Sequence, residues 1–112
     1  MKNTPFLIRG HVRKDLESIR KYTIKKWGNP QWLKYKEILR KRMQALANNP
    51  NLGLSIDEVS RDSYRFSDGK HVFYYLKREN DVVFVGFLSN QMAPEKHLKR
   101  MRSIGSDLNL WR

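Results

Sequence analysis

The spacing of apolar residues changes part-way along the chain, and this change limits the folds that the sequence can adopt. Between residues 13 and 47, apolar side chains recur every three to four residues, which is the spacing of amphipathic helices. Between residues 63 and 88 they form the short apolar runs and alternations typical of strands. Helices followed by strands favour an α+β fold in which the helices cover one face of a sheet.

Two helices are expected in the first half. The apolar positions of the first are Leu16, Ile19, Thr23 and Trp27, and Gly28 is expected to supply a left-handed stop. The second should begin with Asn29 as its cap and Pro30 as its first helical residue. Its apolar stripe contains Trp32, Tyr35, Leu39, Met43 and Leu46. Because so few residues separate the stripes, we expect an antiparallel helical hairpin with Trp27 and Trp32 in the core.

Strands are expected on both sides of this hairpin. One covers residues 6–12, and three more, at 63–66, 71–76 and 82–88, are separated by short turns as in an antiparallel meander. The first strand should join the same sheet, since a lone strand would leave its backbone groups unsatisfied. Residues 51–62 show no regular pattern and are expected to form a loop. The predicted fold is therefore an antiparallel sheet in the order strand, helix, helix, strand, strand, strand.

The C-terminal part is expected to form a short helix and a tail. Pro94 stands where the first turn of a helix tolerates proline, and Gly105 is expected to end that helix. A length of 112 residues fits a single domain. We expect this domain, residues 1–112, to have a compact part at about 6–104 and a tail at 105–112.

Composition excludes several classes of protein. The chain contains no cysteine, which rules out disulfides, thiolate metal sites and thiol catalysis. The three histidines, His11, His71 and His97, do not have the spacing of metal ligands, so neither a metal nor another cofactor is expected. Near the N-terminus only Phe6, Leu7 and Ile8 form an apolar run, which is too short for a signal sequence or a membrane span. A cytoplasmic protein without membrane contact is expected.

Charge is the most unusual bulk property of the chain. The formal net charge is +12, and the first 49 residues contain 13 Lys and Arg against 3 acidic residues. Such a localised positive field favours anionic partners, which include nucleic acids, acidic proteins and membrane surfaces. Charge alone does not choose among them.

The hairpin and the strands together resemble the ParE toxin family of the ParE/RelE superfamily. In the hairpin the resemblance is carried by residues 15–19 (D-L-x-x-I), 22–23 (Y-T), 27–28 (W-G) and 46–53 (L-x-x-x-P-x-x-G). In the strands it is carried by Tyr64-Arg65, by 69–75 (G-x-H-x-x-x-Y) and by 83–92, which ends in Met. These segments cover about residues 15–93 in the family's order and with similar spacing.

The resemblance implies a function and two partners. It implies a bacterial or plasmid-borne toxin of a type II toxin-antitoxin system that has no chemistry of its own, binds DNA gyrase and stabilises its cleaved-DNA state. It also implies a cognate, acidic, ParD-like antitoxin. Candidate target contacts are Arg65, His71, Tyr74 and Trp111. Candidate antitoxin contacts are Arg13, Arg20, Lys34, Arg40, Tyr64 and Phe66.

Four positions depart from the family pattern. Leu76 and Gly86 stand where the family often has Arg, Ser89 where it often has His, and Ala93 where Asp usually follows Met. The polar residues of the last strand are therefore not carried over from the family.

Other interpretations of the same residues stay open. A ribosome-dependent mRNA endonuclease of the RelE type would need acid, base and cationic groups in one cleft, for which Arg65, His71 and Arg78 are the candidates. The structural, hydrogen-bonding interpretation of His71 is favoured over the catalytic one, and Trp111 could pack back on the domain. A basic nucleic-acid-binding module is a third possibility, although no groove-reading motif is present.

Overall fold

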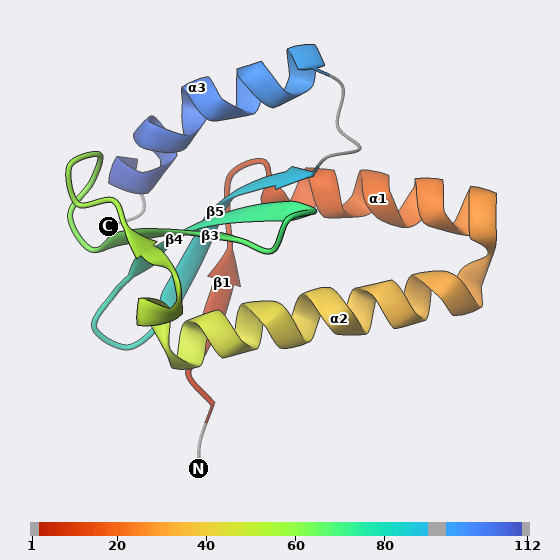
Figure 1. The fold of residues 1–112 in the computed structure, drawn as a ribbon, viewed down its shortest axis with the longest axis horizontal. Coiled ribbons are helices and arrows are strands. Elements are labelled where there is room, and N and C mark those ends of the chain that lie inside the picture. Colours follow the sequence, from red (N-terminus) through yellow and green to blue (C-terminus); the bar gives the residue numbers. More distant parts are fainter. Residues whose placement is uncertain (1–2, 90–93, 111–112) are drawn as a thin grey trace.

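A computed structural model describes residues 3–89 and 94–110 of the chain (Figure 1). Its elements, in chain order, are β1 (Phe6–Ile8), α1 (Val12–Trp27), α2 (Asn29–Asn48), the 3-10 turn η1 (Pro50–Leu52), β2 (Leu54–Ser55), β3 (Ser63–Ser67), β4 (His71–Lys77), β5 (Val82–Ser89) and α3 (Pro94–Leu110). The predicted α+β class, the helical hairpin and the three-stranded meander are confirmed.

The sheet is mixed, whereas a purely antiparallel sheet was predicted. Among the described residues it contains five strands in the order β1-β5-β4-β3-β2. Strands β3, β4 and β5 pair antiparallel as expected, but β1 runs parallel to β5, with Phe6 opposite Val82 and Ile8 opposite Phe84. A parallel pair requires a long connection between its strands, and here the hairpin and three further strands lie between them in the chain.

The prediction of a featureless loop at 51–62 is also wrong in part. The segment contains η1 and the two-residue strand β2, in which Leu54 lies opposite Arg65 and Ser55 opposite Tyr64 of β3. A strand of this length is too short to show an alternation, so only the pairing with β3 identifies it. This addition places β2 at one edge of the sheet and β1 at the other.

Helix α3 continues through Gly105, where the sequence predicted its end. Ile104 and Leu108, four positions apart, are both buried against the face of the sheet that the hairpin leaves uncovered. Burying Leu108 contributes about 2 kcal/mol, which exceeds the roughly 1 kcal/mol that a glycine costs inside a helix. The predicted tail is therefore helical to Leu110, and Trp111 lies outside the described residues.

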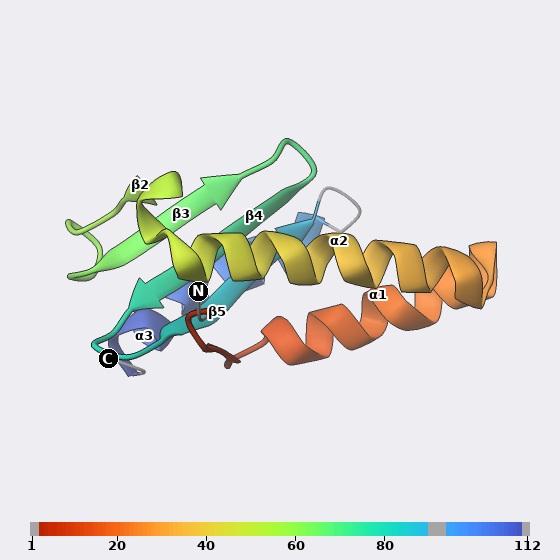
Figure 2. The same ribbon diagram turned by 90° about the horizontal axis from the view of Figure 1, so that it is seen from below.

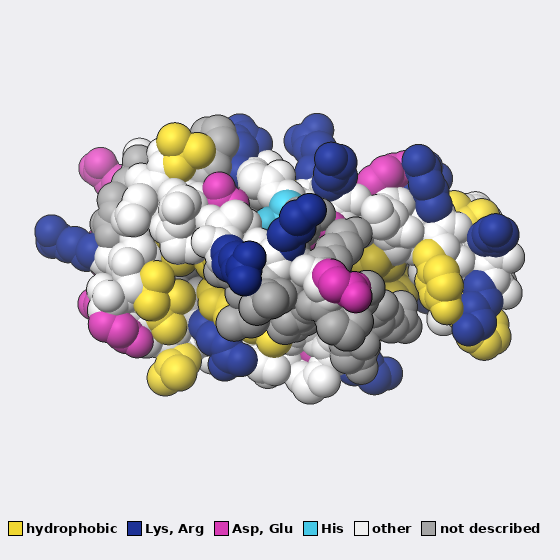
Figure 3. Space-filling view, turned by 90° about the horizontal axis from the view of Figure 1, so that it is seen from above, with side chains coloured by type: hydrophobic (Ala, Val, Ile, Leu, Met, Phe, Trp, Pro, Cys, Tyr) yellow, Lys and Arg dark blue, Asp and Glu magenta, His cyan; other side chains and the backbone are white. Residues whose placement is uncertain are grey.

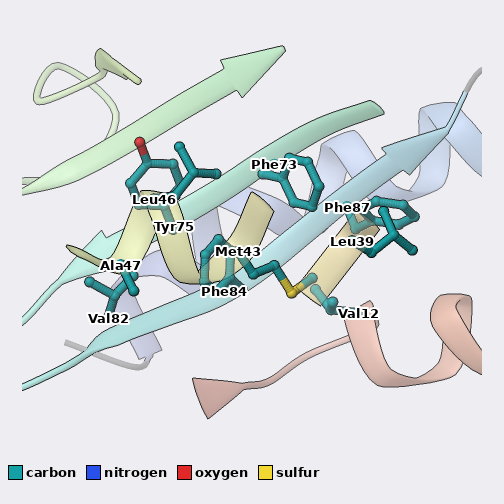
Figure 4. Close-up of a cluster of buried hydrophobic side chains, with 10 residues drawn as sticks. All are labelled: Val12, Leu39, Met43, Leu46, Ala47, Phe73, Tyr75, Val82, Phe84 and Phe87. Carbon is teal, nitrogen blue, oxygen red and sulfur yellow. The ribbon is translucent and has the colours of Figure 1, made fainter. Parts of the chain in front are cut away.

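The sheet separates two hydrophobic cores. Figure 1 shows α3 on one side of the sheet and α2 on the other. The larger core joins the hairpin to the sheet and is drawn in Figure 4; its buried members are Val12, Leu39, Met43, Leu46, Ala47, Phe73, Tyr75, Val82, Phe84 and Phe87. The smaller core, beneath α3, contains Ile56, Leu76, Val83, Val85, Leu88, Ile104 and Leu108.

The turn of the hairpin differs from the prediction in two details. Gly28 has the expected positive φ of 92°, but it is itself the residue before α2, and Asn29 is already helical and provides no side-chain cap. Trp32 is buried as predicted, whereas Trp27 is 64% exposed. Figure 2 shows the reason: the turn end of the hairpin projects beyond the sheet, so no strand lies there for Trp27 to pack on.

Candidate partner-binding grooves

A cavity, the hairpin groove, lies between β1, α1 and α2. It has a volume of about 540 Å³. Its apolar lining residues are Phe6, Ile8, Leu16, Trp32, Leu39 and Met43, and its charged lining residues are Arg13, Glu17, Arg20, Lys36 and Arg40. The apolar stripes of the two helices converge on β1, while the next residues around each helix place long basic side chains at the rim.

The rim of the hairpin groove is positive despite two local ion pairs. Arg20 contacts Glu17 at 2.5 Å, and Arg40 contacts Glu37 at 2.6 Å. Hydrogen bonding to these arginines lowers the pKa of both glutamates, so the pairs stay ionised. Since four basic side chains line the groove against the single carboxylate of Glu17, the groove attracts anionic groups.

The predicted antitoxin contacts lie in three different places. Arg13, Arg20 and Arg40 all line the hairpin groove, whereas Lys34 does not. Tyr64 and Phe66 lie on β3, where they pack against the larger core. The prediction omitted the groove residues Lys36 and Glu17, although their spacing of four from Arg40 and Arg13 places each pair on one helix face.

A second cavity, the turn pocket, lies where the hairpin meets the β3–β4 turn. Its volume is also about 540 Å³. It is lined by Tyr22, Thr23, Trp27, Gln31, Tyr35, Ile38, Arg42, Asp68, Lys70 and His71. Residues from α1, α2 and the sheet therefore meet in one place, and His71 is the predicted site residue that lies there.

His71 connects the β3–β4 turn to α2 through both of its ring nitrogens. Nδ1 lies 3.1 Å from Oδ2 of Asp68, and Nε2 is hydrogen-bonded to the hydroxyl of Tyr35. The ring also stacks on Phe87 with centroids 5.4 Å apart. With Nδ1–H donating to the carboxylate, Nε2 accepts the Tyr35 proton. This arrangement gives His71 the structural, hydrogen-bonding role that was one of its two interpretations.

Asp68 organises the same turn. Its Oδ1 accepts hydrogen bonds from the backbone N–H of Lys70 (2.9 Å) and of His71 (2.7 Å). Burial opposes ionisation of this carboxyl, but the hydrogen bonds from the His71 ring and from the two backbone N–H groups together lower its pKa. Asp68 is therefore a stabilising carboxylate in the neutral range.

Replacing Asp68 with asparagine is expected to destabilise the fold by about 1–2 kcal/mol at neutral pH, because hydrogen bonds to an ionised acceptor are lost. A lowered folded-state pKa stabilises the protein above the unfolded pKa of about 3.9. This stabilisation disappears as the pH falls through the folded-state pKa. Unfolding midpoints of the two proteins should therefore converge in acid; a difference that stays constant with pH would contradict the role of Asp68.

The predicted target contacts lie on opposite faces of the sheet. Arg65 and Tyr74 are opposite each other on β3 and β4, and Arg65 Nε donates to the Tyr74 hydroxyl at 3.3 Å. Alternation along β3 and β4 places them on the α3 face, whereas His71 lies on the hairpin face. Arg78 follows the opposite end of β4 and is bonded to Asp81 at 2.7 Å. The structure does not gather Arg65, His71 and Arg78 in one cleft.

Three of the family departures have a structural explanation. A Cβ at Gly86 would lie 2.9 Å from the Tyr74 Cβ and 3.0 Å from Ile104, so α3 leaves no room for a larger residue. Leu76 is buried in the smaller core, and Ser89 is buried opposite His71. Ala93 lies outside the described residues.

No described helix is long and apolar enough to cross a membrane. Within residues 3–89 and 94–110, no three His, Cys, Asp or Glu side chains cluster in a way that could hold a metal ion.

Comparison with protein families gives one match. Residues 7–94 match the ParE toxin of type II toxin-antitoxin system, parDE. A search of curated proteins finds no match. The matched segment includes every residue that lines the turn pocket and all but Phe6 of those that line the hairpin groove.

Proposed function

Because the chain belongs to the ParE toxin family of type II toxin-antitoxin systems, we propose that it is a toxin that binds DNA gyrase and stabilises its cleaved-DNA state. A cognate, acidic, ParD-like antitoxin neutralises it by occupying the hairpin groove. One observation supports the proposal that the antitoxin binds here: the same cavity combines an apolar floor with a positive rim.

The hairpin groove suits an amphipathic helix with acidic flanks. The partly buried side chains of Phe6, Ile8 and Leu16 offer the apolar surface that supplies most of the affinity in helix-in-groove recognition. The basic rim speeds the encounter with an acidic partner and selects against basic ones. The apolar floor of the groove would thus bind the antitoxin, and the basic rim would favour an antitoxin that is acidic.

Action by binding, without catalysis, is the simpler proposal for the toxic activity. Arg65 and Tyr74 form a polar pair on the α3 face, remote from the hairpin groove, and are available as a target contact. A RelE-type mechanism would need cations and a base together, and the separation of Arg65, His71 and Arg78 does not favour it.

The test uses purified toxin freed of antitoxin. We expect it to inhibit gyrase supercoiling and to cause cleaved DNA to accumulate, and we expect antitoxin to reverse both effects. Arg65→Ala should weaken inhibition without affecting antitoxin binding, while Arg61→Ala, whose side chain is 85% exposed, serves as the matched control. Unaffected gyrase at toxin excess, together with codon-specific mRNA cuts after induction, would replace this proposal with the RelE type.

A further inference from the structure

The turn pocket differs in chemistry from the hairpin groove. Its wall carries exposed aromatic side chains, since Tyr22 is 49% and Trp27 is 64% exposed. The hairpin groove instead encloses aliphatic side chains and a buried Trp32. Exposed aromatic rings are the surfaces on which unpaired bases stack.

Cations surround these aromatic rings. Arg42 and Lys70 line the turn pocket, and the ammonium of Lys26 lies 5.4 Å from the centre of the Trp27 ring. The carboxylate in the pocket, Asp68, is already engaged by the Lys70 and His71 backbone N–H groups and by the His71 ring, and its Oδ2 lies 4.0 Å from Nε of Arg42. Its capacity to repel a phosphate is therefore reduced, and positive charge dominates the rim.

The inner wall offers hydrogen-bonding groups for the edge of a base. With His71 Nδ1–H donating to Asp68, the Tyr35 hydroxyl donates to His71 Nε2, and its oxygen keeps lone pairs that can accept from a ligand. Burial and the nearby charge of Asp68 raise the pKa of Tyr35, so the hydroxyl stays protonated. The amide of Gln31 adds a donor and an acceptor in the same wall.

We propose that the turn pocket binds single-stranded nucleic acid, with one base stacked on Trp27 and the adjoining phosphates held by Lys70 and Arg42. The turn end of the hairpin projects beyond the sheet, and Figure 3 shows basic and hydrophobic side chains side by side at that end, on the right. A nucleic-acid strand can therefore approach the pocket from the turn end of the hairpin, which lies beyond the sheet. Stacking requires an unpaired base, which favours a single strand over a duplex. This activity is separate from the proposed action on gyrase.

The test measures binding of a fluorescent oligothymidylate of about 12 nucleotides by anisotropy, with a duplex of equal length for comparison. We expect the single strand to bind more tightly than the duplex. Trp27→Ala should weaken single-strand binding by about tenfold or more, and Trp27→Phe should retain most of it. Because Trp27 is largely exposed, these variants should unfold at the same temperature as the wild type.

Charge-reversal variants distinguish binding in the turn pocket from non-specific attraction to the positive charge of the whole protein. Lys70→Glu should weaken binding far more than Lys36→Glu, which makes the same charge change in the hairpin groove. Equal losses from the two reversals, with no loss from Trp27→Ala, would show non-specific attraction and overturn the proposal. Tighter binding of polyglutamate than of the oligonucleotide would overturn it as well, in favour of an acidic protein.

Discussion

Gly53→Ala is expected to destabilise the protein by about 3–4 kcal/mol, a large part of the stability of a domain of this size. A Cβ at this position would overlap the Tyr75 hydroxyl and would lie 3.0 Å from the Arg65 carbonyl oxygen. The backbone of Gly53 is extended, with φ of −86° and ψ of 172°. The requirement is therefore for space and not for a conformation that only glycine adopts.

Tyr75 cannot move aside to make this space. It is completely buried, its ring stacks on Tyr64 at 5.5 Å and contacts Phe84 at 5.4 Å, and its hydroxyl donates to the Pro50 carbonyl at 2.8 Å. A side chain inserted at residue 53 must break that hydrogen bond or displace the strand that carries the ring.

Chemical denaturation measures the change in the free energy of unfolding. Two further variants test whether the overlap with the Tyr75 hydroxyl is its cause. Tyr75→Phe removes the overlapping hydroxyl, so the double variant Gly53→Ala with Tyr75→Phe should lose less than the two single losses combined. Gly105→Ala is the matched glycine control, because its Cβ would have 3.9 Å of clearance inside α3 and should stabilise the helix by up to about 1 kcal/mol. Additive losses in the double variant would show that the overlap with the hydroxyl is not the cause.

Reversing the rim of the hairpin groove with Arg13→Glu and Lys36→Glu is expected to slow antitoxin association by about 10- to 1,000-fold at low salt. Within the described part of the chain neither residue forms an ion pair, so both charges are available to an approaching partner. The charged lining would change from four cations against one carboxylate to two cations against three carboxylates. Association should be followed by stopped-flow fluorescence at several salt concentrations, because the difference should narrow as salt screens the charges.

A second pair of reversals controls for net charge. Arg61→Glu with Lys77→Glu makes the same total change on exposed residues that do not line the groove. The control should lose much less of its association rate than the groove variant. Equal slowing in both variants would show that the attraction comes from the net charge of the whole surface. It would contradict the proposal that the antitoxin binds in the hairpin groove.

Much of the fold could be predicted because helices and strands leave a local pattern. The hairpin followed from stripes such as Trp32, Leu39 and Met43, and the β4 and β5 strands from the apolar runs at 72–76 and 82–88. The positive φ of Gly28 also followed from residue type. Each of these features depends on residues close together in the chain.

The candidate sites were predicted only in part, because each combines residues from separate elements. Basic residues of the hairpin were identified, but the sequence does not show that Arg13 and Lys36 share a cavity with β1. Neither Asp68 nor Tyr35 was predicted as a site residue, and Tyr35 was assigned only to the apolar stripe of the second helix. They become significant only when the β3–β4 turn meets α2 and His71 comes between them.

The residue pattern alone established the fold class, the order of the main elements and the relationship to the ParE toxin family, since these rest on periodicity and ordered local motifs. Tertiary contacts decided the direction of β1, the existence of β2, the length of α3 and the exposure of Trp27. The physical reason is the same in each case. Backbone pairing and apolar burial depend on which distant segment lies nearby, and Leu108 therefore extends a helix past a glycine that would end it in isolation.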